Sequence, residues 1–344
     1  MEPDDLAEWT PFSLRWERSG PVVDWRRLHG RRFVEAFFDQ SIHKHQQEIP
    51  GANRTTPAQM LLARIETLPV RLPAGFIFHA SRCGSTLVAR MLASVPRNIV
   101  LSEPAILDSV LYPVFHPTTD GCSVTDAEQA QLLRAIVRAL GQPRHPEEEH
   151  CFVKFSSRAL LKMPLIQRVF PDVPWIFLYR DPREIIGACL RFNNRFPTDR
   201  LPPGIGEAGL IEGDPAELAE MRPEEFWARV LAARFSDALR FYQPGKSLLM
   251  NYTELPEAVC GPIVCGPMLK FFAADYSPED IGCMREAATF NAKSPSREFR
   301  DDSGQKRSTV SENGRALVDW LVMPHYRRLE SIRTGGPLKG KKDF

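Results

Sequence analysis

Short apolar runs of strand type alternate along most of the chain with longer segments whose apolar residues recur at helical spacing. The apolar runs predict strands at residues 76–78, 98–104, 151–155, 174–179 and 247–252. The helical spacing predicts helices at residues 85–92, 125–140, 159–169, 181–192, 223–241 and 314–329. This alternation predicts an α/β fold with a mainly parallel sheet of about five strands flanked by helices, with ligands bound at the carboxyl ends of the strands.

The first 74 residues are rich in aromatic residues and arginine, and they predict helices at residues 31–41 and 57–68. We expect them to form an N-terminal helical lobe that packs on the core and lines part of an acceptor pocket. Residues 193–214 are rich in glycine and proline and predict a surface excursion near the mouth of the site. The expected division of the chain is a lobe at 1–74, an α/β domain at 75–335 and a basic tail at 336–344.

The charge of the chain is nearly balanced, with 44 Lys and Arg against 43 Asp and Glu and a net charge of +1. A nucleic-acid binder usually carries a marked basic excess, so we expect no nucleic-acid partner. An anion site must then be built from a few local cations. The chain has no apolar run long enough to span a bilayer and does not begin with a signal-type segment, so we expect a cytoplasmic protein without a membrane span.

The cysteines form an odd and scattered set of seven, which predicts reduced thiols in a cytoplasm and not a disulfide frame. Cys260 and Cys265 are the one close pair, and they flank Gly-Pro turns without histidines nearby. His43 and His45 stand two apart in a polar segment, where solvated histidines are the usual case. We therefore expect no metal.

Residues 75–92 read as a strand, a tight loop and a helix, and the rest of the predicted chemistry is arranged around this loop. Such a turn leaves the first N–H groups of the helix unpaired and places the positive end of its dipole at the loop, which favours a phosphate. Gly84 lets the backbone approach an anion, and the Ser85 and Thr86 hydroxyls and the Arg82 guanidinium can add charge-assisted bonds. The loop therefore predicts a phosphate site, while an ordinary strand-to-helix turn remains the alternative.

A comparison with the nucleotide-triphosphatase loop G-x-x-x-x-G-K-[ST] narrows the ligand. Gly84 and Thr86 fit that pattern, but Ser85 stands in place of the lysine and His79 in place of the first glycine. The sequence thus favours a phosphate that is not part of Mg·ATP.

The segment Arg82-Cys-Gly-Ser-Thr86 resembles the 5′-phosphosulfate loop of the sulfotransferase family, P-[KR]-S-G-[ST]-T. A second segment, Arg180-Asp-Pro after a predicted strand, resembles the family's 3′-phosphate motif. The resemblance implies a three-layer P-loop-like fold and a donor, 3′-phosphoadenosine 5′-phosphosulfate (PAPS), whose product PAP is gripped at both ends. The family's serine eight residues after the arginine is replaced by Ala188, and Arg180-Asp-Pro by itself is also a capped helix start.

Glu103 ends the predicted strand that follows the loop, and the resemblance implies that it is the general base. Glutamate has this role in the tyrosylprotein and Golgi-type branches, whereas the cytosolic branch uses a histidine in a K-x-H segment. Here Lys154 keeps that lysine and Ser156 replaces the histidine. Arg82 is the expected cation on the bridging oxygen, with Lys154 as helper. The alternatives are a solvent-facing strand-end acid for Glu103, a helix-end cation for Arg82 and a snorkelling strand residue for Lys154.

A late loop with Lys306 and Arg307 resembles the loop that covers the cofactor in that family, although a solvated basic loop fits equally well. The residues expected to bind the cofactor are Arg82, Cys83, Gly84, Ser85, Thr86, Leu87, Arg180, Ala188, Lys306 and Arg307. The sequence thus predicts a PAPS-dependent sulfotransferase of bacterial type with a small-molecule acceptor, of unspecified identity and oligomeric state. Two alternatives stay open, a P-loop small-molecule kinase and a non-catalytic module that binds a nucleotide or a sulfated ligand on the same fold.

Overall fold

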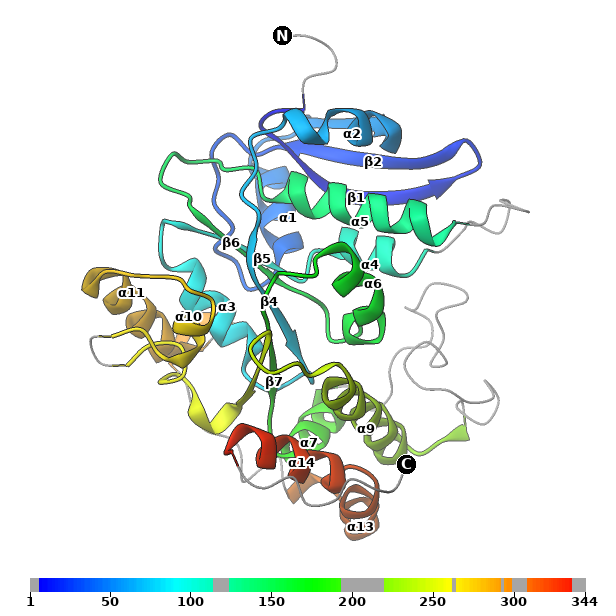
Figure 1. Cartoon of the computed structure of the whole chain (residues 1–344), viewed down its shortest axis with the longest axis vertical. Helices are drawn as coiled ribbons and strands as arrows, with labels where there is room; N and C mark the ends of the chain where they lie inside the picture. The colour runs from blue at the N-terminus through cyan, green and yellow to red at the C-terminus, as the bar shows by residue number, and fades with distance from the viewer. Residues whose placement is uncertain are drawn as a thin grey trace.

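A five-stranded parallel sheet forms the centre of the molecule in the computed structural model, which describes residues 6–113, 124–192, 220–261, 264–291, 294–298 and 308–335 (Figure 1). Its strands, in spatial order, are β5 (Asn98–Ser102), β6 (His150–Lys154), β4 (Pro73–His79), β7 (Trp175–Tyr179) and β8 (Ser247–Asn251). All four pairings are parallel. The order reverses at β4, because β5 and β6 lie on one side of it and β7 and β8 on the other. A crevice at the carboxyl ends of strands at such a reversal is where open α/β sheets bind ligands.

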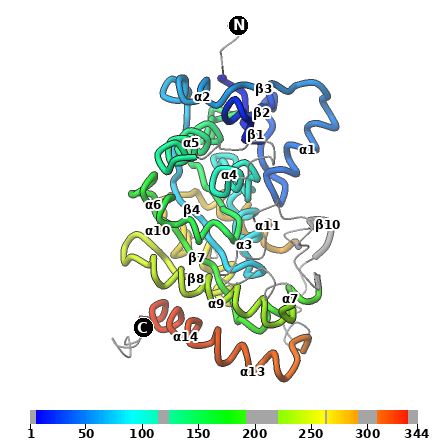
Figure 2. Tube along the Cα trace, turned by 90° about the vertical axis from the view of Figure 1, so that its right-hand side faces the viewer, coloured from blue at the N-terminus to red at the C-terminus, as the bar shows by residue number. Residues whose placement is uncertain are grey.

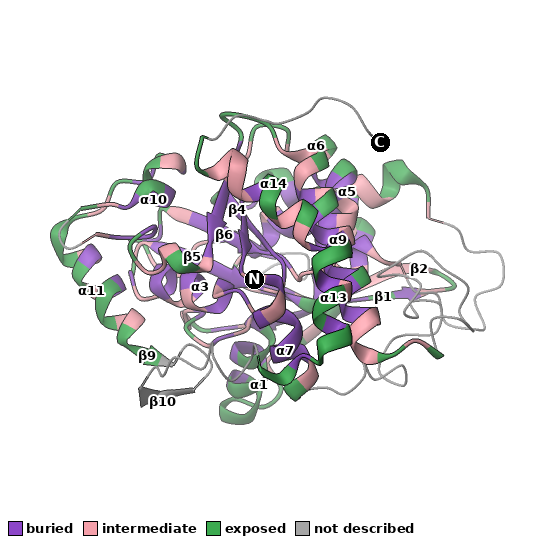
Figure 3. Ribbon diagram, turned by 90° about the horizontal axis from the view of Figure 1, so that it is seen from below, coloured by how far each residue is buried: buried purple, intermediate pink, exposed green. Residues whose placement is uncertain are grey.

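Helices connect and cover these strands, as the periodicity predicts. Their bounds are α3 (Ser85–Ala93), α4 (Ala105–Leu111), α5 (Asp126–Leu140), α6 (Met163–Val169), α7 (Pro182–Phe192), α9 (Pro223–Phe241), α10 (Pro267–Phe271), α11 (Pro278–Thr289), α13 (Glu312–Leu321) and α14 (Met323–Arg333), with short 3-10 turns η2 (Ala159–Lys162) and η5 (Tyr252–Glu254). The sheet strands are buried along almost their whole length (Figure 3), so their continuous apolar composition suits a sheet covered on both faces. The predicted α/β fold with a central parallel sheet flanked by helices is confirmed.

Two predicted helices are each divided. The segment at 159–169 begins as η2 and becomes α6 at Met163, and the segment at 314–329 is divided into α13 and α14 at Val322. A proline follows each division, Pro164 in α6 and Pro324 in α14. Proline lacks the backbone N–H and fits only the first turn of a helix, so each proline starts a new helix.

The N-terminal segment contains more than the predicted helices. The strands β1 (Trp9–Glu17), β2 (Gly20–Arg27) and β3 (Asn53–Pro57) form an antiparallel sheet, accompanied by α1 (Phe38–Glu48), α2 (Ala58–Arg64) and η1 (Ile65–Thr67). The prediction of a purely helical lobe is therefore wrong, while the helix at 57–68 matches α2 and η1. The missed signal is the period-two burial of Leu14 with Trp16 and of Val23 with Trp25.

The N-terminal segment packs directly on the α/β sheet region (Figure 2). The Trp16 indole donates to the carbonyl of Ser109 at 3.0 Å, and the Ser102 hydroxyl donates to the carbonyl of Ala36 at 2.8 Å. The amide of Ala105 donates to the Asp39 carboxylate at 3.2 Å. The carboxyl end of β5 is therefore held in place by residues of the first 74.

The polar region after α11 is not wholly a loop. It includes the short antiparallel pair β9 (Phe290–Asn291) and β10 (Ser294–Glu298). The predicted excursion at 193–214 and the basic tail lie outside the described residues, as does the loop with Lys306 and Arg307. None of the helices in the described ranges is long and apolar enough to cross a membrane.

Candidate active site

The strand register gathers charged side chains from four neighbouring strands at one edge of the sheet. Ser102 pairs with Lys154, so Glu103 follows directly beside the end of β6. Lys154 pairs with Ile77, and His79 at the end of β4 pairs with Leu178 of β7. Arg180 comes two residues after Leu178. Side chains far apart in the sequence thus share one carboxyl edge.

The loop between β4 and α3 has the backbone of an anion cradle. Ser81, Arg82 and Gly84 all have positive φ, at 73°, 50° and 88°. The loop is fixed to β7 because the Ala80 amide and the Cys83 thiol both donate to the carbonyl of Leu178, at 2.9 and 3.1 Å. α3 begins at Ser85, and Gly84 at the N-cap position has no side chain with which to cap it. The first N–H groups of α3 and its dipole therefore face the loop, as anion binding requires.

Gly84 cannot carry a side chain in this setting. A Cβ built on it would lie 2.7 Å from Leu255 Cδ1 and 2.8 Å from Tyr252 Cδ2. With the left-handed φ, this close contact makes any other residue costly at this position. The loop is thus packed against the end of β8.

Arg180 lies beside the same tyrosine. Its guanidinium carbon is 3.8 Å from the centre of the Tyr252 ring, and its Nε donates to the Glu184 carboxylate one turn along α7. The Arg180 side chain is 4% exposed and the Glu184 side chain 5%. Tyr252 therefore touches both the phosphate loop and Arg180, so the two motifs lie side by side. Ala188 is buried within α7.

A further buried arginine, which the sequence analysis missed, reaches the loop from α9. Arg234 is 4% exposed, and its Nη1 donates to the carbonyl of Ala80 at 3.2 Å. Within the described ranges no carboxylate lies at ion-pair distance from it. Burial lowers the pKa of Arg234 to about 10, so it stays charged at neutral pH. The signal in the sequence is an arginine on the apolar face of a long helix.

Three buried cations act electrostatically on Cys83 in the loop, and they are Lys154 from β6, Arg180 after β7 and Arg234 from α9. Burial raises the pKa of the Cys83 thiol to about 11, so this thiol is protonated and adds no negative charge. Lys154 and Arg180 are paired with Glu103 and Glu184 respectively. Arg234 is the cation without such a partner in the described part of the chain, and it gives the loop a surplus of positive charge.

Glu103 follows β5, the outermost strand of the sheet, and two nitrogen atoms lie beside its carboxylate. The fully buried Lys154 ammonium donates to its Oε1, and His79 Nε2 lies 3.3 Å from the same oxygen. Burial acts to raise the pKa of Glu103, but the His79 contact and the charge of Lys154 outweigh it and hold that pKa well below its usual range. Glu103 is therefore an ionised carboxylate at neutral pH, and its side chain keeps 25% of its surface exposed.

Further carboxylates lie near Glu103. Burial raises the pKa of Asp39 to about 6, and the nearby charges of Asp108 and Glu103 act in the same direction. Asp108 accepts from the Ser156 hydroxyl at 2.6 Å and from Arg158 at 2.8 Å. Ser156 is thus hydrogen-bonded to Asp108, and it occupies the position at which the cytosolic branch has a histidine.

Of the other expected cofactor residues, Ser85 and Thr86 are buried, and Arg82 and Leu87 are half-buried. Within the ranges that the structure describes, no group of three His, Cys, Asp or Glu side chains comes together in a way that could hold a metal ion.

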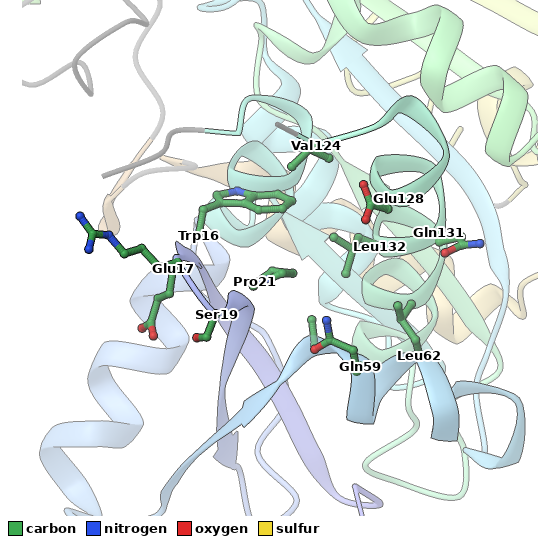
Figure 4. Close-up of a pocket in the computed structure, with 13 residues that line it drawn as sticks. Trp16, Glu17, Ser19, Pro21, Gln59, Leu62, Val124, Glu128, Gln131 and Leu132 are labelled. Atoms are coloured by element: carbon green, nitrogen blue, oxygen red, sulfur yellow. The ribbon is translucent and has the colours of Figure 1, made fainter. Parts of the chain in front are cut away.

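A pocket of about 330 Å³ lies in another part of the molecule, between the β1–β2 hairpin, α2 and α5 (Figure 4). Its walls include Trp16, Pro21, Gln59, Leu62, Glu128 and Leu132. None of the expected site residues lines it, so it is separate from the phosphate loop.

No family model matches the sequence, and no curated protein matches it. Solved structures with a similar fold include the sulfotransferase domain from the curacin biosynthetic pathway, which is 19% identical, covers 78% of this chain and 99% of its own, and has a TM-score of 0.41. The sulfotransferase domain of the Synechococcus PCC 7002 olefin synthase is 16% identical, with coverages of 77% and 95% and a TM-score of 0.40. A Mycobacterium avium sulfotransferase is 14% identical, with coverages of 80% and 81% and a TM-score of 0.39.

These similar structures are sulfotransferases, the family that the two motifs resemble. Identities below 20% and TM-scores of this size describe a likeness of fold and carry no argument about the residues or the reaction of this chain.

Proposed function

We propose that this chain is a PAPS-dependent sulfotransferase that moves a sulfuryl group to a hydroxyl or amine of a small molecule. The observation that carries the proposal is the contact of Tyr252 with both Gly84 and Arg180. It brings a helix N-terminus and a buried guanidinium together, which supports a single ligand with two anionic ends. Three buried cations around one loop add the charge that such a ligand requires.

In the proposed reaction the 5′-phosphosulfate lies on the amides of residues 83–87, and the 3′-phosphate faces Arg180. The acceptor oxygen or nitrogen attacks sulfur in line, so one bond to sulfur forms as the bond from sulfur to the bridging oxygen breaks. The acceptor proton passes to Glu103, and the bridging oxygen leaves with the electron pair as part of PAP. Arg82, Lys154 and Arg234 neutralise the charge that develops on that oxygen.

The pairing of Lys154 with Glu103 has a consequence for this mechanism. While the two are paired, the ammonium lowers the proton affinity of the carboxylate. When an anionic donor binds, Lys154 can pair with the donor as well as with Glu103. Lys154 then lowers the pKa of Glu103 less, and Glu103 becomes a stronger base. Binding of the donor thus prepares the base.

The two alternatives are weaker on physical grounds. A kinase needs a lysine at the position of Ser85 and a carboxylate for Mg²⁺. A binding module has no need to keep a carboxylate partly exposed beside the loop. We also propose a cytoplasmic location, which the six free cysteines in the described part of the chain support.

The test is the variant Glu103→Gln, assayed with radiolabelled PAPS and 2-naphthol. We expect sulfation to fall about 100- to 10,000-fold, since a general base contributes that much, while PAP still raises the melting temperature as it does in the wild type. Glu66→Gln, at an exposed position away from the site, is the matched control. A wild-type rate in Glu103→Gln would overturn the assignment of the base.

The donor is tested separately, by comparing the effect of PAP, AMP and ATP with Mg²⁺ on the melting temperature. A specific ligand at 100 times its dissociation constant stabilises by about 2.7 kcal/mol. We expect PAP to stabilise most. Stabilisation by ATP with Mg²⁺ and none by PAP would favour the kinase.

A further inference from the structure

His79 is a buried side chain between the phosphate loop and Glu103 that the proposed reaction does not yet use. It ends β4 and is 5% exposed. Its Nδ1 accepts a hydrogen bond from the Ser81 amide at 3.1 Å, and its Nε2 lies 3.3 Å from Glu103 Oε1. One imidazole thus touches both the loop backbone and the carboxylate.

The contact with Ser81 determines which nitrogen carries the proton. A ring nitrogen that accepts an N–H bond has no hydrogen of its own, so in the neutral ring the proton is on Nε2, the atom facing Glu103. Burial and the charge of Lys154 lower the pKa of His79, which keeps the ring neutral at neutral pH. The backbone contact therefore specifies the tautomer, and the electrostatics specify the neutral charge state.

The two segments that His79 joins have unusual backbones. Ser81 and Arg82 in the loop and Glu103 after β5 all have left-handed φ values, 73°, 50° and 51°, without being glycine. Such conformations are strained and persist where surrounding contacts hold them. A side chain bonded to one segment and in contact with the other is well placed to hold both.

We propose that His79 is a positioning residue that couples the conformation of the phosphate loop to the orientation of Glu103. Through Ser81 it follows the loop, and through Nε2–H it directs Oε1 toward the acceptor. The inference rests on the proposed function, in which Glu103 takes the acceptor proton.

The other charged groups around this pair act differently. Lys154 from β6 contacts Glu103, Asp39 from α1 lies near its exposed side, and Arg234 from α9 lies on the His79 side. Lys154 is a cation paired with Glu103, and an anionic group of the donor can attract it away from that carboxylate. His79 is neutral and tied to the backbone, and its Nε2 has no hydrogen-bond partner among the described residues, so it is available to donate to Glu103 when Lys154 is shared with the donor.

Two substitutions separate the contacts of His79. His79→Asn places a carbonyl oxygen near the position of Nδ1, so it can still accept from Ser81 but cannot reach Glu103. His79→Gln places an amide N–H near Nε2, so it can still donate to Glu103. His43→Asn, at an exposed histidine of α1, is the matched control.

For His79→Asn we expect PAP to bind as in the wild type, while kcat for sulfation of 2-naphthol falls about 10- to 100-fold. The pKa of the Glu103 carboxyl should rise toward its usual range. This pKa is measured by following the carbon-13 signal of the carboxyl with pH, and the signal is assigned by its absence in Glu103→Gln. His79→Gln should recover most of kcat and keep that pKa low. A purely structural role would not produce this split between the variants.

Wild-type kcat and an unmoved Glu103 titration in His79→Asn would overturn the inference, as would equal losses in both variants. If His79→Asn does not fold, His79→Gln is compared with the wild type alone. The inference then requires a kcat and a Glu103 titration close to those of the wild type, and a large change in either would overturn it. If the wild type transfers no sulfuryl group but the Glu103 titration shifts as expected, the positioning role stands and the proposed function fails.

Discussion

Arg234 shows what a single residue contributes here. It is a buried guanidinium that donates to the carbonyl of Ala80 and lies among apolar neighbours on α9. A buried charge without a carboxylate partner is costly, and such a charge is usual where a ligand supplies the missing partner. We therefore include Arg234 in the anion site, beside Lys154 and Arg180.

The variant Arg234→Met tests this at the residue scale. We expect PAP affinity to fall roughly 10- to 100-fold, because a hydrogen bond to a charged group contributes about 1.5–3 kcal/mol. The melting temperature of the free protein should stay the same or rise, since a buried charge that has no carboxylate partner among the described residues is replaced by an apolar chain of similar length. Calorimetric titration with PAP and thermal unfolding measure the two effects.

Arg229→Met, at an exposed position on the same helix, serves as the reference. A lower melting temperature without a change in PAP affinity would make Arg234 a structural residue only.

At the scale of elements, the site depends on how the loop after β4 packs on the end of β8. Gly84 permits the left-handed turn into α3 and leaves room for Tyr252, whose ring lies against Arg180. The loop, the tyrosine and the arginine form one packed unit. A change in the loop should therefore alter the position of the Arg180 side chain.

Gly84→Ala should cost both stability and binding. The left-handed φ adds roughly 1–2 kcal/mol, and the contacts of the new Cβ with Tyr252 and Leu255 add about 1–3 kcal/mol of overpacking. PAP affinity should fall as Tyr252 is displaced. Denaturant unfolding and PAP titration are the measurements.

Gly245→Ala separates strain from packing. Gly245 has a similar φ of 81°, but nothing lies within 4 Å of its added Cβ. The Gly245→Ala variant should lose only the stability that the left-handed φ costs, which is the smaller of the two contributions, and it should bind PAP as the wild type does. Equal losses in the two variants would show that the contact with Tyr252 has no effect.

At the scale of the whole molecule, hydrogen bonds join the N-terminal segment to the α/β sheet beside Glu103. Asp39 on α1 accepts from the amide of Ala105, two residues after Glu103. Burial raises the pKa of Asp39 to about 6, well above the value of a carboxyl in the unfolded chain. Folding therefore favours the protonated form of Asp39.

The sign of the pH dependence follows from this shift. The contribution of Asp39 to stability is fully present below a pH of about 4 and is lost as the pH rises through about 6. Asp39→Asn keeps the acceptor for Ala105 without a charge. It should melt close to the wild type at pH 4.5 and at a higher temperature at pH 7.5. A difference in melting temperature that is constant with pH would contradict this.

Part of the fold and the site could be predicted because it depends on local patterns. Apolar runs predicted all five strands of the central sheet, and the loop at 82–86 and Arg180 could be identified from residue types alone. The strands β1 and β2 were not predicted because their buried and exposed positions alternate only over short stretches, residues 14–17 and 22–25. His79 was identified only as a departure from another motif.

By itself the sequence determined the alternation of strands and helices, the tight loop between β4 and α3 and the position of Glu103 at a strand end, because these depend on neighbours in the chain. Only the tertiary structure decided that Arg234 and His79 belong with them, and that Lys154 and Glu103 are paired. The register of the parallel strands and the crossing of α9 bring these groups together, and neither depends on local sequence. The electrostatics of the site follows from that arrangement, because the effect of each charge depends on how deeply it is buried and on what lies beside it.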